Sequence, residues 1–357
     1  MAAAAGGMQA AGASETVAAA PGTGCEPRIS GSFFDLIHVN PFDAAYWSEP
    51  CRFWGEDNWR ALMRDMHGIG IDTVICVSTA FWGRPMFAGY EKKVGIPMKF
   101  GCEDPLAVCV DEVEKLGMKI FLGFGFRGRC SQVRDYAGME PPWPEVWFRW
   151  NTAMAEVLME RFASRPCFAG LYVSYEADFR EHEVNLYEKL VKEYLRPACG
   201  SVKLLASPGN LGDHPNLAAF PKQVERTGLN ILAPQDYGGR TSNVEDALNL
   251  VRKNARALEQ VRKPLQDLGV ALWSNCETFN KEPTPDGRAA TIAGPIERIT
   301  QQIALQAPLV EKLICYQYQG IMNRHTELVN IGHPSTNELY RGYAAYLNER
   351  FPGRFGV

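Results

Sequence analysis

Short apolar runs, almost unbroken by polar residues, recur along this chain and alternate with stretches of helical periodicity. Continuous apolar runs of this kind are typical of parallel strands that are buried on both faces. The predicted strands cover residues 29–36, 73–79, 119–126, 168–176, 202–207, 229–235, 269–273 and 312–318. The clearest helical patterns cover residues 57–67, 105–116, 145–163, 181–195, 244–261, 295–307 and 336–349. This repetition predicts an α/β protein with a single (β/α)8 barrel of the TIM type.

The predicted loops differ in length between the two ends of the barrel. Joins from helix to strand are short, whereas joins from strand to helix are long, as in residues 37–56 and 81–103. In a barrel the long joins lie at the C-terminal ends of the strands, where active sites form. These loops are rich in aromatic residues, and we predict that Trp47, Trp54 and Trp82 line a cleft and stack on sugar rings. Packing of the loops themselves is the alternative use of these side chains.

Two glutamates stand where apolar runs end. Glu176 closes the fourth predicted strand and Glu277 follows the seventh, with 277 − 176 = 101 residues between them. The tips of strands four and seven face each other across the mouth of a barrel. Two carboxyl groups in that arrangement are what hydrolysis of a glycosidic bond requires. A single strand-end glutamate more often caps a helix or pairs with an arginine, but the two together favour a catalytic pair.

Other side chains at or just after the strand ends are of the types that hydrogen-bond or stack on sugars. A tyrosine after strand six, Tyr237, could orient the strand-seven carboxylate, while tyrosines near strand eight have core packing as their alternative. Besides the three tryptophans, the predicted substrate-binding residues are Asp35, His38, Arg127, Tyr175, Gln235, Asp236, Tyr237, Trp273, Asn275, Tyr316 and Gln317.

Composition narrows the possible partners. The chain has 357 residues, a net charge of −4 and no block of basic residues, so nucleic acid is not an expected partner. No apolar run is long enough to span a bilayer, so no membrane partner is expected either. The ten cysteines form no CxxC pair, and no metal or cofactor motif occurs. We expect no cofactor and a small carbohydrate substrate; the sequence indicates no oligomeric state.

The first residues differ in composition from the rest. Residues 1–27 are rich in alanine and glycine and predict a disordered tail, and residues 28–357 predict the catalytic barrel. The tail lacks the basic start and apolar centre of a secretory signal. Scattered cysteines suit a reducing compartment. The cytoplasm is therefore the expected location, with secretion expected instead if the natural chain starts differently.

Several segments resemble a known family. Residues 29–35, 70–75 and 115–123, and then 170–176, 231–236 and 272–279, are similar to an uncharacterised, mostly bacterial barrel family usually placed beside the clan-A glycoside hydrolases. The resemblance covers roughly residues 29–347. It implies a barrel and a carbohydrate substrate, with Glu176 as general acid/base and Glu277 as nucleophile or base. Clan-A members commonly carry Asn before the strand-four Glu, and this chain has Tyr175 there.

Two other functions stay open on the sequence alone. A metal-dependent sugar isomerase or lyase would need a cluster of His, Asp and Glu side chains drawn from several strands. A carbohydrate-binding barrel without catalytic activity would keep the aromatic loops but not depend on the two glutamates. Both alternatives share the predicted fold, so only the site can separate them.

Overall fold

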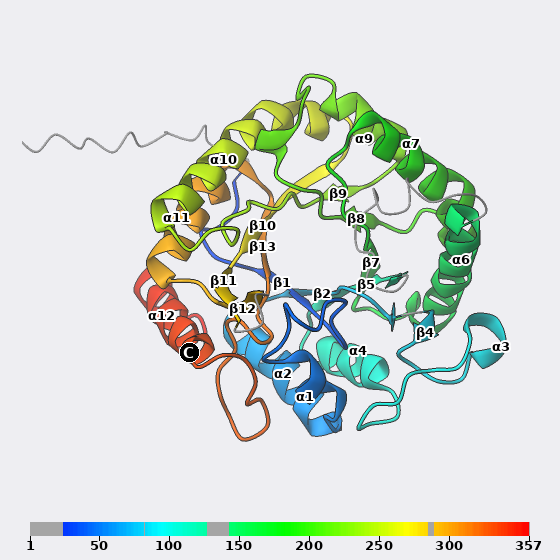
Figure 1. The fold of residues 1–357 in the computed structure, drawn as a ribbon, viewed down its shortest axis with the longest axis horizontal. Coiled ribbons are helices and arrows are strands. Elements are labelled where there is room, and N and C mark those ends of the chain that lie inside the picture. The colour runs from blue at the N-terminus through cyan, green and yellow to red at the C-terminus, as the bar shows by residue number, and fades with distance from the viewer. Residues whose placement is uncertain (1–23, 82, 127–142, 285–288, 357) are drawn as a thin grey trace, which may run out of the picture.

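The computed structural model describes residues 24–81, 83–126, 143–284 and 289–356, and the predicted barrel is confirmed. Eight parallel strands close in the order β1-β13-β10-β9-β8-β7-β5-β2 (Figure 1). Their bounds are β1 Gly31–Phe34, β2 Thr73–Cys76, β5 Lys119–Gly123, β7 Phe168–Val173, β8 Leu204–Ala206, β9 Ile231–Leu232, β10 Ala271–Glu277 and β13 Lys312–Tyr316. Each lies within or overlaps one predicted strand.

Closure joins the first and last strands. Gly31 of β1 pairs with Ile314 of β13 on one side and with Thr73 of β2 on the other. A Cβ atom at Gly31 would lie 2.6 Å from the Ile314 side chain, so this position has room only for glycine. The barrel interior is filled by side chains that alternate with those facing the helices, including Phe33, Phe121 and Trp273.

Helices surround the barrel on all sides in Figure 1. Their bounds are α1 Ser48–Arg52, α2 Glu56–Gly68, α3 Glu91–Val94, α4 Pro105–Lys115, α6 Trp143–Phe162, α7 Glu181–Lys189, α8 Arg196–Cys199, α9 Phe220–Thr227, α10 Val244–Asp267, α11 Ile296–Gln306 and α12 Ser335–Arg350. Every predicted helical pattern is found as a helix. A π-helical segment, Leu190–Leu195, joins α7 to α8. Asp104 caps α4 by accepting the N–H of Ala107 (2.9 Å), and Pro105 follows as its first residue.

Some small elements were not predicted. A hairpin of β11 (Phe279–Pro283) and β12 (Ala289–Ala293) follows strand β10, and a small sheet joins β3 (Ala80–Phe81), β4 (Arg84–Pro85) and β6 (Gly125–Phe126). Both belong to connections that follow barrel strands, so they add structure at the C-terminal face.

The N-terminal boundary of the barrel domain lies earlier than predicted. The N–H of Cys25 donates to Ala307 O (2.9 Å), and the Tyr346 hydroxyl donates to Pro27 O (2.6 Å). Residues 25–27 therefore pack on the barrel rather than belonging to a tail. Residues 1–23 lie outside the described part of the chain.

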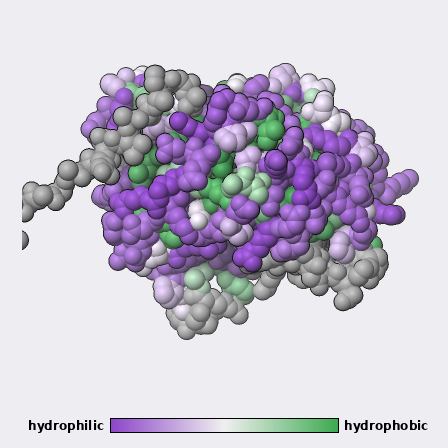
Figure 2. Space-filling view, turned by 90° about the horizontal axis from the view of Figure 1, so that it is seen from above, coloured by the Kyte–Doolittle hydropathy of each residue, from purple (hydrophilic) through white to green (hydrophobic). Residues whose placement is uncertain are grey.

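Polar residues dominate the face of the molecule in Figure 2, and the apolar ones there are scattered rather than gathered in one patch. Within the described ranges, no helix combines the length and apolar character that crossing a bilayer requires.

Candidate active site

A cavity of about 390 Å³ lies at the C-terminal ends of the barrel strands. Its apolar and aromatic lining consists of Phe33, Val39, Phe42, Val77, Tyr172, Phe279 and Tyr316. Its polar lining consists of His38, Asn40, Asp43, Ser174, Glu176, Ser207, Gln235, Asn275, Glu277, Lys281 and Thr291. A cavity of this size with aromatic walls and convergent polar groups can hold a small molecule, and here the polar residues outnumber the apolar ones. We call it the glutamate cavity, because Glu176 and Glu277 both line it.

Glu277 ends β10 and is buried, with 5 % of its surface exposed. The N–H of Gly239 donates to Glu277 Oε2 (2.9 Å). Burial, followed by the negative charge of Asp236, raises the pKa of Glu277 to about 8, while the Gly239 N–H and the charges of Arg240 and Arg298 act in the opposite direction. The free cavity therefore holds Glu277 with its proton at neutral pH.

Asp236 fixes the end of strand β10 from behind the cavity. Its Oδ1 accepts the N–H groups of Gly238 (2.9 Å) and Glu277 (3.1 Å), and its Oδ2 accepts Nε2 of Gln302 (2.6 Å) and Gln306 (3.0 Å). Both glutamines stand on α11, four residues apart, so they face the barrel together. Asp236 is fully buried and does not line the cavity. The structure therefore places Asp236 behind the cavity, where its hydrogen bonds hold the end of β10, and not at the surface where substrate would lie.

Glu176 follows β7, the fourth barrel strand, and is half-buried. Two strands, β8 and β9, separate β7 from β10 in the barrel. Side chains alternate along a strand, so Tyr172, Ser174 and Glu176 face the interior and line the glutamate cavity. Glu176 also lines a second cavity of about 300 Å³, which makes it the residue shared by the two spaces.

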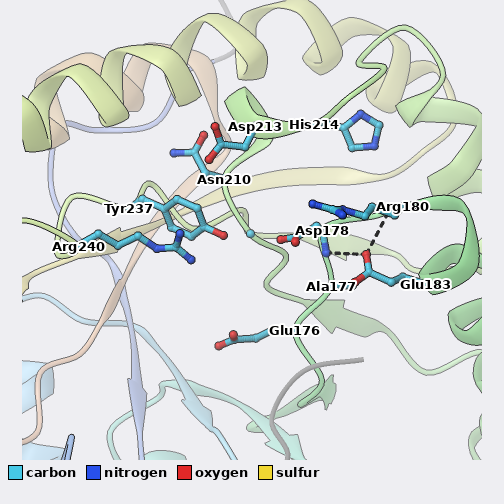
Figure 3. Close-up of a pocket in the computed structure, with 11 residues that line it drawn as sticks. Glu176, Ala177, Asp178, Arg180, Glu183, Asn210, Asp213, His214, Tyr237 and Arg240 are labelled. Atoms are coloured by element: carbon cyan, nitrogen blue, oxygen red, sulfur yellow. Dashed lines mark hydrogen bonds between the residues drawn. The ribbon is translucent and has the colours of Figure 1, made fainter. Parts of the chain in front are cut away.

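The second cavity is formed by the loops that follow β7, β8 and β9. Figure 3 shows Tyr237 and Arg240 on one wall, Asp178 and Arg180 on the opposite wall, and Glu176 at one end. The remaining lining residues are Ala177, Glu183, Gly209, Asn210, Asp213 and His214. We call it the mixed-charge cavity, because both carboxyl and guanidinium groups line it.

Two backbone outliers flank the mixed-charge cavity. Tyr237 has φ 61° and Phe179, between Asp178 and Arg180, has φ 56°; among the described residues they alone combine positive φ with a side chain. Left-handed backbone is costly for bulky residues and clusters at functional sites. Arg240 covers the Tyr237 ring, with Cζ 3.3 Å from the ring centroid.

Comparison with known proteins identifies the family of this chain. Residues 29–327 match the family described as a domain of unknown function (DUF4434). The chain belongs to the DUF4434 family. Comparison of the chain with curated protein sequences finds no match.

The barrel of this DUF4434 protein is similar to that of solved structures. One is described as a putative alpha-L-fucosidase from Bacteroides thetaiotaomicron VPI-5482, at 17 % identity and a TM-score of 0.64, covering 94 % of this chain and 99 % of that one. Another is a family 39 glycoside hydrolase from Bacteroides cellulosilyticus WH2, at 13 % identity and a TM-score of 0.52, covering 89 % of this chain and 63 % of that one. At these identities the likeness shows the fold.

The structure brings six of the sixteen predicted site residues of this DUF4434 protein together. Those that line the glutamate cavity are Glu176, Glu277, His38, Gln235, Asn275 and Tyr316. Asn275 Nδ2 donates to Ser207 Oγ (3.1 Å) and Gln235 Nε2 donates to Ser207 O (3.2 Å), which orients both amides. Tyr237 lines the mixed-charge cavity instead. The hydrogen bond to Glu277 expected from it comes from the Gly239 N–H.

The prediction that Trp47 and Trp54 line a cleft is wrong. They are 1 % and 8 % exposed and belong to the main hydrophobic core. Trp54 packs edge-on against Trp59, with centroids 4.9 Å apart, and Trp47 packs so closely on Gly320 that a Cβ there would lie 2.5 Å from its ring. The long first loop uses these rings to pack down on the barrel. Trp82 and Arg127 lie outside the described residues.

Two further predictions are corrected, one by strand alternation and one by depth in the barrel. Tyr175 lies between two inward-facing positions of its chain segment, so it faces the helices, where its hydroxyl donates to Gly125 O (3.2 Å) and pairs with Asn151. Trp273 does face the barrel interior but lies deeper than Asn275 and Glu277. There it packs edge-on against Phe121, with centroids 5.8 Å apart. Neither lines the glutamate cavity.

Asp35 and Gln317 lie behind the cavity wall and are both buried. Burial raises the pKa of Asp35 to about 6, opposed by the charge of His38. The side chain of Gln319 bonds to both Asp35 backbone groups, and Gln317 Nε2 donates to Gln319 O (2.9 Å). Neither residue lines the glutamate cavity, so the structure does not place them where the predicted direct contact with substrate requires them.

The sequence analysis missed the part of the glutamate cavity that the β11–β12 hairpin supplies. Phe279, Lys281 and Thr291 all line the cavity. Lys281 Nζ donates to Asp43 Oδ1 (2.7 Å) and Thr291 Oγ1 (2.9 Å), and the Thr291 N–H donates to Asp43 O (2.9 Å). These bonds fasten the hairpin to the loop after β1. A Pro-Asp-Gly sequence between the two strands was an available turn signal.

The described ranges contain no group of three or more His, Cys, Asp and Glu side chains placed to hold a metal ion. The ligand set that a metal-dependent isomerase needs is therefore not found among them.

Proposed function

We propose that this protein hydrolyses an O-glycosidic bond with Glu176 and Glu277. The observation that carries the proposal is that both strand-end carboxyl groups, from the fourth and seventh strands, line one cavity at the C-terminal mouth of the barrel. The two structural neighbours named above are described as glycoside-cleaving proteins, which supports the same reaction class.

The walls of the glutamate cavity suit a sugar ring. Phe42, Phe279 and Tyr316 offer aromatic surface for its apolar face, and Gln235 and Asn275 offer amide groups for its hydroxyls. Lys281, held by Asp43 and Thr291, adds a fixed donor on the hairpin side.

In the proposed mechanism Glu176 donates a proton to the leaving oxygen and Glu277 attacks the anomeric carbon. Glu176 then removes a proton from the water that hydrolyses the glycosyl-enzyme ester. The reactive state has one proton on the pair, which must reside on Glu176. In the free cavity burial favours that proton on Glu277. Positive charge developing on the sugar favours the ionised form of Glu277, so substrate shifts the proton toward Glu176.

The test uses 4-nitrophenyl glycosides of common pyranoses in both anomers, including the α-L-fucoside, with Glu176→Ala and Glu277→Ala variants in the presence of azide. We expect each variant to lose turnover and azide to restore it. The glycosyl azide should keep the substrate configuration with Glu176→Ala and invert it with Glu277→Ala. Native turnover in both variants would refute the proposal. Saccharide binding by the native protein without turnover of any glycoside would indicate a binding protein instead.

A further inference from the structure

The mixed-charge cavity has no task in the mechanism above, although it shares Glu176 with the glutamate cavity. If Glu176 protonates the leaving oxygen, the group attached to that oxygen must lie on the far side of Glu176 from the attacked sugar. The mixed-charge cavity is the space that adjoins Glu176 outside the glutamate cavity. Its position therefore fits the leaving group.

The lining of this cavity is polar nearly throughout. Tyr237 supplies its aromatic ring, but Arg240 covers one face of that ring at 3.3 Å. An apolar aglycone would find little apolar surface there. Burial raises the pKa of Tyr237 to about 12, so its hydroxyl stays protonated and can donate as well as accept.

Four carboxyl groups (Glu176, Asp178, Glu183 and Asp213) and two guanidinium groups (Arg180 and Arg240) line the cavity, and other groups offset part of the negative excess. Asp213 pairs with Lys253 (2.5 Å), and Glu183 accepts the N–H groups of Asp178 and Arg180 (3.0 Å each). Arg240 makes no ion pair with any described residue, and it lies beside the carboxylates of the cavity. Hydroxyl groups can accept from guanidinium and donate to carboxylate, so a neutral polyol fits this lining better than an ion of either sign.

We propose that the mixed-charge cavity is a leaving-group subsite for a neutral sugar, so that the natural substrate is a disaccharide or a longer saccharide. This inference rests on the proposed function. Gly209 marks the floor of the subsite, because a Cβ there would lie 2.4 Å from Tyr237 Oη and 2.6 Å from Asp178 Oδ1.

The experiment compares a 4-nitrophenyl glycoside with a disaccharide that carries the same attacked sugar. We expect Gly209→Ala and Asp178→Asn each to lower the ratio of kcat/KM for the disaccharide to kcat/KM for the aryl glycoside by about tenfold, the scale of a lost polar contact. The matched control is Asp267→Asn on α10, far from either cavity, which should leave the ratio unchanged. A ratio within twofold of native in both subsite variants would overturn the inference, even if the protein is a glycosidase.

Binding provides a readout that does not depend on turnover. In the Glu277→Gln background, whose turnover is largely lost, isothermal titration calorimetry should show binding of the disaccharide at least tenfold tighter than binding of the free attacked sugar, and adding Gly209→Ala should remove that difference. Equal affinities of the Glu277→Gln protein for the two ligands would refute the subsite. Absence of hydrolysis by the native protein together with the expected affinity difference would refute the catalytic proposal alone.

Discussion

The two proposed catalytic glutamates have very different surroundings. Glu277 is buried at the end of a strand whose backbone is tied to Asp236, and through it to Gln302 and Gln306 of α11. Glu176 is half-buried between two cavities, next to loops that carry charges of both signs. One carboxyl group is thus fixed and desolvated, whereas the other borders open polar space. Unlike environments are how one pair of identical side chains divides acid and nucleophile roles.

The largest expected effect is on rate. Glu176→Gln and Glu277→Gln should each lower kcat/KM on a 4-nitrophenyl glycoside by about 10²- to 10⁴-fold, because positioned proton transfer and covalent attack are both lost. The loss in Glu176→Gln should shrink on a 2,4-dinitrophenyl glycoside, whose leaving group needs no proton. The loss in Glu277→Gln should not. Equal recovery in both variants would contradict the division of roles.

The buried surroundings of Glu277 should also contribute more to stability than the open surroundings of Glu176. Asp236→Ala leaves two buried glutamine amides and two backbone N–H groups without their acceptor, and should lower the free energy of unfolding by about 2–4 kcal/mol. Asp178→Ala on the open side should change it by no more than about 0.5 kcal/mol. Urea denaturation of the two variants measures both values. Similar losses of unfolding free energy in the two variants would show that Asp236 and Asp178 contribute equally to stability.

Protonation offers a third test. The pKa of Glu277 is higher in the folded protein, about 8, than its ordinary value of 4.5, so its stabilising contribution is complete below pH 4.5 and is lost as pH rises through 8. Glu277→Gln removes this loss and keeps an acceptor for the Gly239 N–H. From pH 6 to pH 8 the free energy of unfolding of the variant should rise by on the order of 2 kcal/mol relative to that of the native protein. Parallel stability curves in denaturant at the two pH values would argue against a buried, protonated Glu277.

The smallest expected effect concerns the hairpin. Lys281 and Asp43 are each about one-third exposed, at 34 % and 33 % of the side chain, so Lys281→Met should cost under about 1 kcal/mol of stability. The same variant should raise KM clearly, because Lys281 also lines the glutamate cavity. A melting temperature lowered by many degrees, with KM unchanged, would show that the hairpin only supports the fold.

The barrel could be predicted because buried parallel strands leave a direct signal in apolar runs, and Glu176 and Glu277 could be found because each ends such a run. The tryptophans of the first loop could not be assigned in this way. Trp47 and Trp54 stand in a sequence that is equally compatible with a cleft and a core, and only tertiary packing against Trp59 and Gly320 decides.

The depth of a side chain in the barrel also could not be predicted from the sequence. Trp273, Asn275 and Glu277 all face the barrel interior, but the distance along the strand places only the last two at the cavity. The prediction for Tyr175 was wrong for a different reason, because period-two alternation turns its side chain outward toward the helices. The lining from the hairpin depends on contacts between Lys281 and Asp43, 238 positions apart, which no local pattern reveals.

The pairing of β1 with β13 also constrains how the protein is made. Gly31 finds its partner Ile314 only after nearly the whole chain has been synthesised, so the first strand waits with one edge unpaired during translation. Both proposed catalytic glutamates leave the ribosome before that last strand does. A chain released early would expose the open edges of β1 and β10, which are ready templates for aggregation. Completion of the cavity and protection from aggregation therefore depend on the same final strand.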